Sequence, residues 1–219
     1  MDAFKYVPTR RTMVGRLVKA YSSASHDQRA AGLAWYGRFG DVARSLAVRH
    51  GVSFDDAAGV LAIVSPRVTV AASVMLADTV LREHASGRRR LGVCKGLNAN
   101  VLAAWRWLDG DRSGLALDVG GLTRARKVRS FYANITGDVG AVTVDVWAAR
   151  AAGWRGGDRF PQGGAYVAIA DAYRAAARRC GVSPRELQAV VWCVTRSDVD
   201  AGRELAAIAG WLDTDDTVR

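Results

Sequence analysis

Residues 121–150 read Gly121-Leu-Thr-Arg-Ala-Arg-Lys127-Val-Arg-Ser-Phe-Tyr-Ala-Asn-Ile-Thr-Gly137-Asp-Val-Gly-Ala-Val-Thr-Val-Asp145-Val-Trp-Ala-Ala-Arg150. This stretch predicts a helix from near Arg124 to near Gly137, then a loop, then a second helix opened by Asp145. Within the loop, residues 142–144 alternate in the manner of a short strand, although three residues decide little. Lys127 and Asp145 thus stand near the starts of successive helices, and we expect their side chains to converge on one site.

The chemistry of this pair follows from its position. The positive end of a helix dipole and the arginines on either side of Lys127 disfavour a further positive charge, which favours a neutral, nucleophilic amine. Asp145 at a helix start is expected to be held ionised by backbone N–H groups, ready to stabilise a sugar cation or accept a proton. The same residues also suit plain structural roles, because an aspartate often caps a helix and a lysine among arginines often contacts solvent or phosphate.

Helical periodicity extends outward from this segment in both directions. Start signals occur at Ser53 and at Ser183-Pro184-x-Glu186, and the apolar spacing predicts further helices over about 53–64, 70–82, 98–108, 164–181 and 200–212. In the helix over 98–108 we expect Val101, Leu102, Trp105 and Leu108 on the inner face. No heptad persists, so about nine or ten helices predict an all-α globule rather than a coiled coil. We expect one domain over residues 1–219, with a core over about 41–197 on which helices within 9–40 and 200–212 pack.

The charge of the chain favours a polyanionic partner. The 219 residues include 31 Lys and Arg against 21 Asp and Glu, a net charge of +10. Between Arg82 and Arg129 eleven basic residues stand against four acidic ones. Ribosomal and membrane-surface proteins are also basic, but this concentration along one stretch favours nucleic acid.

The sequence also argues against membrane-spanning, secreted, disulfide-linked and metal-binding proteins. No apolar run approaches the roughly 20 residues of a membrane span, and the N-terminal residues lack the apolar core of a secretory signal. We therefore expect a soluble protein of the cytoplasm of a bacterial or phage-infected cell. The three cysteines (Cys94, Cys180 and Cys193) and three histidines (His26, His50 and His84) are too widely spaced for a disulfide framework or a metal site. We expect no metal, no cofactor and a monomer.

The segment that holds Lys127 and Asp145 resembles the recognition segment of the helix-hairpin-helix DNA glycosylases. That segment reads approximately Leu-Pro-Gly-x-Gly-x-Lys, then a helix, then Val-Asp-x-His, and here Lys127 precedes Asp145 by the 18 residues that the family shows. Lys127-Val128 followed by residues 141–146 looks especially like the 8-oxoguanine branch, and the motif as a whole is most similar to the 8-oxoguanine and endonuclease III-like glycosylase-lyases. Upstream, residues 64–69 are similar to the family's Leu-Ser-x-Gln-x-Thr turn, with Arg67 in place of the glutamine that fills the gap left by an extruded base.

The likeness covers about residues 57–152 and includes departures. Thr123 and Ala125 replace both hairpin glycines, and Gly121-Leu122 stands where Leu-Pro is expected. Arg124 and Arg126 are therefore expected to contact phosphate directly in place of the amides of a tight turn. The cysteine set of the family's iron–sulfur cluster is missing from the sequence, which implies a cluster-free branch with a compact, all-α, multi-helix fold.

The resemblance implies a DNA glycosylase with associated lyase activity. Such an enzyme bends duplex DNA and extrudes one nucleotide into a pocket. Lys127 is then the nucleophile at the sugar C1′, and Asp145 steadies the sugar cation. The expected DNA contacts are Arg67, Arg88, Arg89, Arg90, Thr123, Arg124, Arg126 and Arg129. Candidates for the base pocket or for a wedge are Trp107, Trp147, Trp154, Gln188 and Trp192.

Among the tryptophans, the neighbouring residues separate core from surface candidates. Trp105 and Trp192 fall on apolar stripes, which favours the core. Trp107 and Trp154 stand beside charged or glycine-rich loops and are the better stacking candidates.

Two other functions remain open. Some phage relatives of this fold look like enzymes that install modifications on thymine in DNA, and in that class Lys127 would bind phosphate or a leaving pyrophosphate. The chain could also be a DNA-binding protein that keeps the scaffold without chemistry, which the altered hairpin favours.

Overall fold

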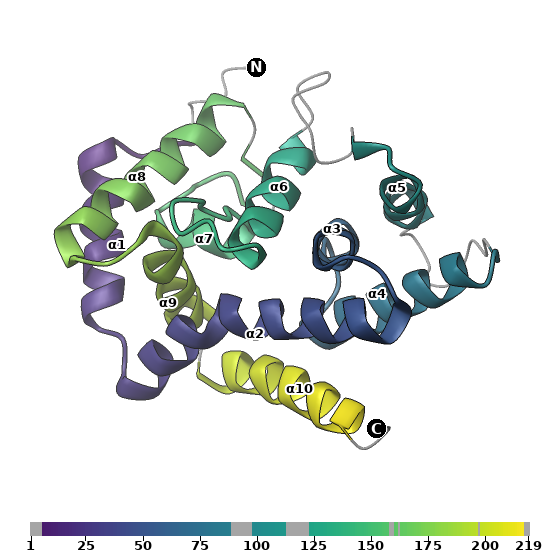
Figure 1. Cartoon of the computed structure of the whole chain (residues 1–219). Helices are drawn as coiled ribbons and strands as arrows, with labels where there is room; N and C mark the ends of the chain where they lie inside the picture. Colours follow the sequence, from purple (N-terminus) through teal and green to yellow (C-terminus); the bar gives the residue numbers. More distant parts are fainter. Residues whose placement is uncertain are drawn as a thin grey trace. The chain divides into compact units, whose positions relative to one another are not determined.

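A computed structural model describes residues 6–88, 98–112, 123–157, 160–161, 163–196 and 198–216, with side chains at 123–125, 198–201 and 214–216 outside the description. Within these ranges the chain forms helices joined by turns and extended loops, without a strand (Figure 1). The helices are α1 (Arg10–Ser22), α2 (His26–His50), α3 (Phe54–Val64), α4 (Val70–Ala85), α5 (Asn98–Leu108), α6 (Thr123–Ile135), α7 (Val146–Ala151), α8 (Gly164–Cys180), α9 (Pro184–Arg196) and α10 (Asp198–Asp216). The all-α prediction is confirmed.

Side-chain caps set several helix starts where the sequence predicts them. Ser53 Oγ accepts a hydrogen bond from the Asp56 N–H at 3.0 Å, and α3 begins at Phe54, directly after Ser53. Ser183 Oγ accepts from the Glu186 N–H at 3.2 Å, while Glu186 Oε2 accepts from the Ser183 N–H at 2.9 Å. This reciprocal pair satisfies two N–H groups that a helix start leaves unpaired, so α9 begins at Pro184.

The alternating residues 142–144 do not form a strand. They run as an extended, buried segment into α7, and the Val144 N–H donates to the Tyr166 hydroxyl at 3.2 Å. A side-chain oxygen therefore supplies the acceptor that a neighbouring strand supplies in a sheet.

The chain divides into two compact units. The first comprises residues 1–36 and 118–202, and the second comprises residues 37–117 and 203–219. In the first unit α1 packs on α8 and α9, and α9 packs on α7 and α8. Its core is built from small and aromatic residues: Ala148, Ala172 and Tyr173 are fully buried, and Met13 and Leu17 of α1 join them. This unit holds both Lys127 and Asp145.

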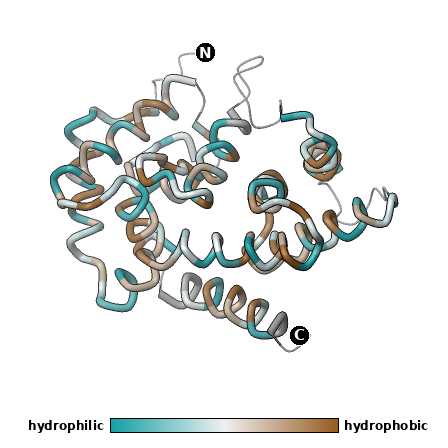
Figure 2. Tube along the Cα trace, in the orientation of Figure 1, coloured by the Kyte–Doolittle hydropathy of each residue, from teal (hydrophilic) through white to brown (hydrophobic). Residues whose placement is uncertain are grey.

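In the second unit α3 forms the centre and packs on α4 and α5. Every residue of α3 from Ala57 to Val64 is buried, and Figure 2 shows hydrophobic segments along this helix. Gly59 allows a close approach, because a Cβ there would lie 2.2 Å from the Trp107 ring.

The inner face of α5 differs from the prediction. Val101 and Trp105 are buried as expected, but Leu102 is 42% exposed and Trp107 is only 5% exposed. Trp107 is therefore a core residue, and the prediction that it is a stacking or wedge residue at the surface is wrong. The indole fits inward because Gly59 leaves space for it, and the Arg112 guanidinium covers it at 3.9 Å from the ring centroid.

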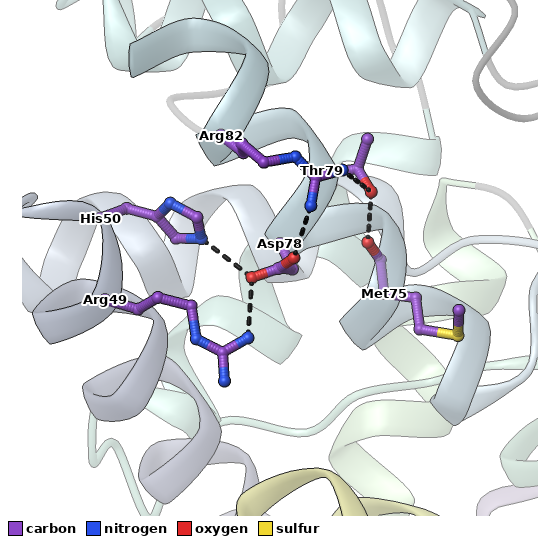
Figure 3. A network of polar contacts seen from close by, with 6 residues as sticks. All are labelled: Arg49, His50, Met75, Asp78, Thr79 and Arg82. Carbon is purple, nitrogen blue, oxygen red and sulfur yellow. Dashed lines mark hydrogen bonds and ion pairs between the residues drawn. The ribbon is translucent and has the colours of Figure 1, made fainter. Parts of the chain in front are cut away.

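An ionic network joins α2 and α4 within the second unit (Figure 3). Asp78 accepts from Arg49 at 3.0 Å and lies 2.9 Å from His50 Nε2, both at the end of α2. Arg82, one turn further along α4, lies 3.4 Å from the other carboxylate oxygen of Asp78. The His50 and Asp78 side chains are only 9% and 16% exposed, so little water competes for the contact between these two residues.

Candidate functional site

Asp145 is fixed through both of its carboxylate oxygens. It is the N-cap of α7, where Oδ1 accepts from the Ala148 N–H at 2.7 Å. Oδ2 accepts from the Trp192 Nε1–H at 3.0 Å, which connects α7 to α9. An anion at a helix N-terminus is stabilised by the unpaired N–H groups and the helix dipole, so the carboxylate is held in one orientation.

The Tyr166 hydroxyl connects the start of α6 to the segment that leads into Asp145. Its oxygen accepts from the Val144 N–H and lies 3.4 Å from the Arg126 carbonyl oxygen and 3.2 Å from that of Val142. Arg126 and Val144 are the residues immediately before Lys127 and Asp145. The peptide bond between Arg126 and Lys127 and the backbone N–H of the residue before Asp145 therefore meet at one phenol oxygen, although Lys127 and Asp145 are 18 residues apart in sequence.

The Lys127 side chain has no polar partner in the described part of the chain. It is half-buried on α6, and its ammonium makes no hydrogen bond or ion pair with the residues that the structure describes. A half-buried amine without a carboxylate partner is available to a ligand, whereas an amine in an ion pair must first leave its partner. Lys127 thus differs from Asp145, both of whose oxygens have protein donors.

Tryptophan and arginine side chains form a cluster beside Asp145. We call Trp147, Arg150, Trp192 and Arg196 the Trp–Arg cluster. The Arg196 guanidinium lies 4.8 Å from the Trp192 ring centroid and 5.7 Å from that of Trp147, and Arg150 lies 4.9 Å from the Trp147 centroid. Cations over indole rings attract the negative ring faces. The cluster thus places two positive charges and two aromatic surfaces next to the fixed carboxylate.

The rest of the Trp192 environment is apolar and tightly packed. Trp35 of α2 lies against Trp192 with ring centroids 4.5 Å apart, and Trp192 itself is 8% exposed. Trp192 lies on an apolar face, as the sequence predicts. The sequence does not predict its hydrogen bond to Asp145. Gly32 permits close packing of α2 on α9, because a Cβ there would lie 2.6 Å from the Val190 backbone.

Gln188 belongs to a buried polar group and not to the surface of the site. The Tyr36 hydroxyl donates to Gln188 Oε1 at 2.5 Å, and Asn134 Nδ2 donates to Thr143 Oγ1 at 2.9 Å. Gln188 is 3% exposed and Asn134 is fully buried. The Gln188 amide is buried and bonded to Tyr36, so it is not available to contact a base. Gln188 is therefore no longer a candidate for the base pocket.

Three tyrosines surround the site as neutral phenols. Burial raises the pKa of Tyr36, Tyr166 and Tyr173 above the ordinary value of 10.0, and the negative charge of Asp145 raises each of them further. A neutral phenol keeps its proton for donation. Tyr173 uses this proton to donate to the Ala148 carbonyl oxygen at 3.0 Å, which holds the first turn of α7.

The expected DNA contacts are distributed over both units. Arg126 is half-buried and Arg129 exposed, both on α6 of the first unit. Arg67 and Arg88 are exposed in the second unit, after α3 and after α4. The remaining four lie beyond the description: Arg89 and Arg90 fall outside the described residues, and Thr123 and Arg124 belong to α6 but their side chains are not described.

Arg67 stands out by its backbone. Its φ of 69° makes it the one non-glycine residue with positive φ in the described part of the chain. An L-residue with a side chain adopts this left-handed conformation at an energetic cost, and such positions gather at functional turns. The exposed side chain is presented between Pro66 and the Thr69 cap of α4.

Trp154 is half-buried and packs edge-on against Tyr6, with centroids 5.8 Å apart. Its ring also covers Gly156, where a Cβ would lie 2.3 Å from the indole. Both contacts are within the first unit, and they leave Trp154 as a half-buried residue at the edge of that unit's core.

The sequence did not single out Arg150, Arg196, Trp35 or Tyr166. A local signal exists for the two arginines, because Trp147 and Arg150 stand three residues apart and Trp192 and Arg196 four apart on helices. Tyr166 and Trp35 act through partners far away in sequence, and no local pattern marks them.

Metal-binding clusters and membrane-spanning helices are both absent from the described ranges. Histidine, cysteine and carboxylate side chains there form no group of three or more that could hold a metal ion. None of the described helices has both the length and the apolar character that crossing a bilayer requires.

Comparison with known proteins places the chain in a family. Residues 4–199 match the profile of DUF7178, a family of unknown function, and this match covers most of the chain. The chain belongs to the DUF7178 family. No curated protein and no solved structure matches it. For this DUF7178 protein, function must therefore be argued from the site itself.

Proposed function

We propose that the chain is a DNA N-glycosylase with lyase activity that acts on an extruded nucleotide at Lys127 and Asp145. The observation that carries the proposal is the shared contact at Tyr166, whose hydroxyl meets the Arg126 carbonyl, directly before Lys127, and the backbone N–H of Val144, the residue before Asp145. An amine and a carboxylate are the groups that this reaction requires. Asp145 is held by two hydrogen bonds, whereas Lys127 has no polar partner among the residues that the structure describes. The net charge of +10 supports binding of DNA.

In the proposed reaction the Lys127 amine attacks the sugar C1′ and forms an N–C bond. The bond between C1′ and the base breaks, and the base leaves with the electron pair and takes up a proton. The amine then loses a proton, the C1′–O4′ bond of the sugar ring breaks and O4′ takes up a proton, which leaves a protonated Schiff base between Lys127 and the opened sugar. Asp145 stays ionised and stabilises the positive charge on the sugar as the base departs.

The Trp–Arg cluster supports the same proposal. Indole faces can stack with any base, and arginines can pair with phosphate oxygens beside it. Arg150 and Arg196 cover the indoles in the free protein. In the proposed complex the guanidiniums turn toward DNA phosphate and leave a ring face of Trp147 to the extruded base.

Borohydride trapping tests the reaction. The protein is incubated with duplexes that carry an abasic site or a damaged base, and borohydride reduces any Schiff base to a stable covalent adduct. We expect an adduct with the wild-type protein and none with Lys127→Gln, whereas Lys19→Gln, which removes an exposed lysine of α1, should trap normally. Wild-type protein that binds these duplexes but neither traps nor releases a base would contradict the proposal.

A second function, DNA binding without chemistry, is favoured by one observation. Both Asp145 oxygens already accept hydrogen bonds from the protein, as in a purely structural cap. The same trapping experiment separates the two functions, because a binding protein retains affinity for DNA in Lys127→Gln and shows no covalent adduct in any variant.

A further inference from the structure

A pocket separate from Asp145 lies between the start of α1 and one face of α8. Its volume is about 530 Å³, within the range of about 300 to 1,000 Å³ that is usual for small-molecule sites. All of its lining residues belong to the first unit, and none of them belongs to the site around Lys127 and Asp145. The lining residues are Val7, Pro8, Arg10, Met13, Ala168, Asp171, Arg174 and Arg178.

The α8 side of the pocket is one stripe of the helix. Ala168, Asp171, Arg174 and Arg178 follow each other at spacings of three and four residues, which places their side chains on the same face. Arg174 Nη1 donates to Asp171 Oδ1 at 2.9 Å, so this pair is neutral as a whole. Arg178, one turn further, has no ion-pair partner within the described part of the chain.

The α1 side supplies a second guanidinium, that of Arg10, which has no ion-pair partner among the described residues, and an apolar floor. Arg10 is the first residue of α1 and is exposed. Below it, Met13 is 2% exposed, and Val7 and Pro8 are half-buried. The pocket thus combines two unneutralised positive charges at its rim with an apolar wall beneath them.

We propose that this pocket binds an organic phosphate the size of a mononucleotide. A phosphomonoester carries close to two negative charges at neutral pH, which the guanidiniums of Arg10 and Arg178 match in number, and guanidinium N–H groups pair well with phosphate oxygens. The volume exceeds what inorganic phosphate needs, and the apolar wall of Val7, Pro8 and Met13 suits a base or sugar. The same chemistry is offered by a free nucleotide and by the 5′-phosphorylated end of a DNA strand.

Equilibrium binding to the full chain tests this proposal. Deoxynucleoside 5′-monophosphates are compared with the same nucleosides without phosphate, and a short oligonucleotide with a 5′-phosphate is compared with its 5′-hydroxyl form. We expect the phosphate to strengthen binding by at least about tenfold in one of the two comparisons. A gain with free nucleotides assigns the pocket to a small molecule, and a gain with the oligonucleotide alone assigns it to a strand end.

Matched variants locate the binding in the pocket. Arg10→Gln and Arg178→Gln should each weaken binding about tenfold. Arg11→Gln and Arg179→Gln remove exposed arginines next to them in sequence that do not line the pocket, and these should bind as the wild type does. All four positions are exposed, so the variants should fold. The proposal fails if the phosphate makes no difference in either comparison, or if the control variants lose as much affinity as the pocket variants.

The result of the nucleotide-binding experiment is independent of the result of the borohydride trapping at Lys127. Loss of trapping in Lys127→Gln leaves the pocket intact, and loss of nucleotide binding in Arg178→Gln leaves both reactive residues intact. The two proposals can therefore fail separately.

Discussion

At the scale of single residues, Asp145 combines a structural role with a proposed chemical one, and two substitutions separate them. Asp145→Ala removes the acceptor for Ala148 and Trp192, and we expect the free energy of unfolding to fall by about 1–3 kcal/mol. Asn is also a good N-cap, so Asp145→Asn should lose less stability. It should still lose most borohydride trapping, because the negative charge is gone.

Urea denaturation and trapping of the same preparations check this prediction. Trp192→Phe serves as the control, since it removes the indole N–H donor but leaves the carboxylate as the cap of α7. Equal loss of trapping in Trp192→Phe and Asp145→Asn would show that the charge of Asp145 is not the feature that matters.

Arg67 gives a second prediction at the residue scale. Glycine adopts positive φ without strain but loses more entropy on folding, so Arg67→Gly should leave the free energy of unfolding within about 0.5 kcal/mol of wild type. Arg67→Val places a β-branched residue at a φ of 69° and should lower it by about 1–2 kcal/mol. Denaturation curves of the two variants decide this, and equal stability would mean that the turn relaxes.

At the scale of elements, the packing of α3 on α5 depends on Gly59. A methyl group there meets the Trp107 ring, so Gly59→Ala should lower the free energy of unfolding by about 1–3 kcal/mol despite the higher helix propensity of alanine. The matched control is Gly37→Ala in α2, where an added Cβ has no atom within 4 Å. This control should gain up to about 1 kcal/mol. Thermal denaturation that shows the two variants shifting in the same direction would contradict the packing argument.

Helix caps also make stability depend on pH. Hydrogen bonds from the Ser183 N–H and hydroxyl hold the pKa of Glu186 below its ordinary value of 4.5. Burial acts to raise the pKa of Asp56, but hydrogen bonds from Ser53 and Arg112 outweigh it and lower the pKa. Because these carboxyls take up protons more readily in the unfolded chain, their stabilisation is present above the unfolded pKa values and is lost as pH falls through the folded ones.

Urea denaturation as a function of pH measures this effect. We expect the free energy of unfolding to fall as the pH drops below about 4.5, and to fall less steeply in Glu186→Gln. Asp55→Asn removes an exposed carboxylate beside Asp56 and should leave the slope unchanged. A slope that is the same in Glu186→Gln and wild type would assign the acid sensitivity to other groups.

The sequence predicts elements well where the signal is local. The starts of α3, α7 and α9 follow from cap residues that bond within three positions, and the structure has these bonds. The burial of Trp107 could not be predicted from its neighbours in sequence, because the space that receives the indole is made by Gly59, 48 positions earlier. The bond between Asp145 and Trp192 and the contacts of Tyr166 likewise join distant positions. The composition of the site could therefore be predicted in part, but its internal contacts could not.

At the scale of the whole molecule, the net charge of +10 makes the proposed DNA binding depend on salt. Each phosphate neutralised by a lysine or arginine releases condensed counterions, so the logarithm of the binding constant should fall linearly with the logarithm of salt concentration. With about five phosphate contacts the slope is about −4.5.

Titrations of a labelled duplex at several salt concentrations measure this slope. Arg129→Gln and Arg88→Gln, which remove exposed predicted contacts in the two units, should each make it shallower by about 1. Arg179→Gln removes the same charge outside the predicted contacts and should leave the slope unchanged. An equal change of slope in all three variants would show that DNA binding depends on net charge alone. A wild-type slope near zero would exclude phosphate contacts as the source of binding. A loss confined to Arg129→Gln would restrict the DNA contact to the unit that carries Lys127 and Asp145.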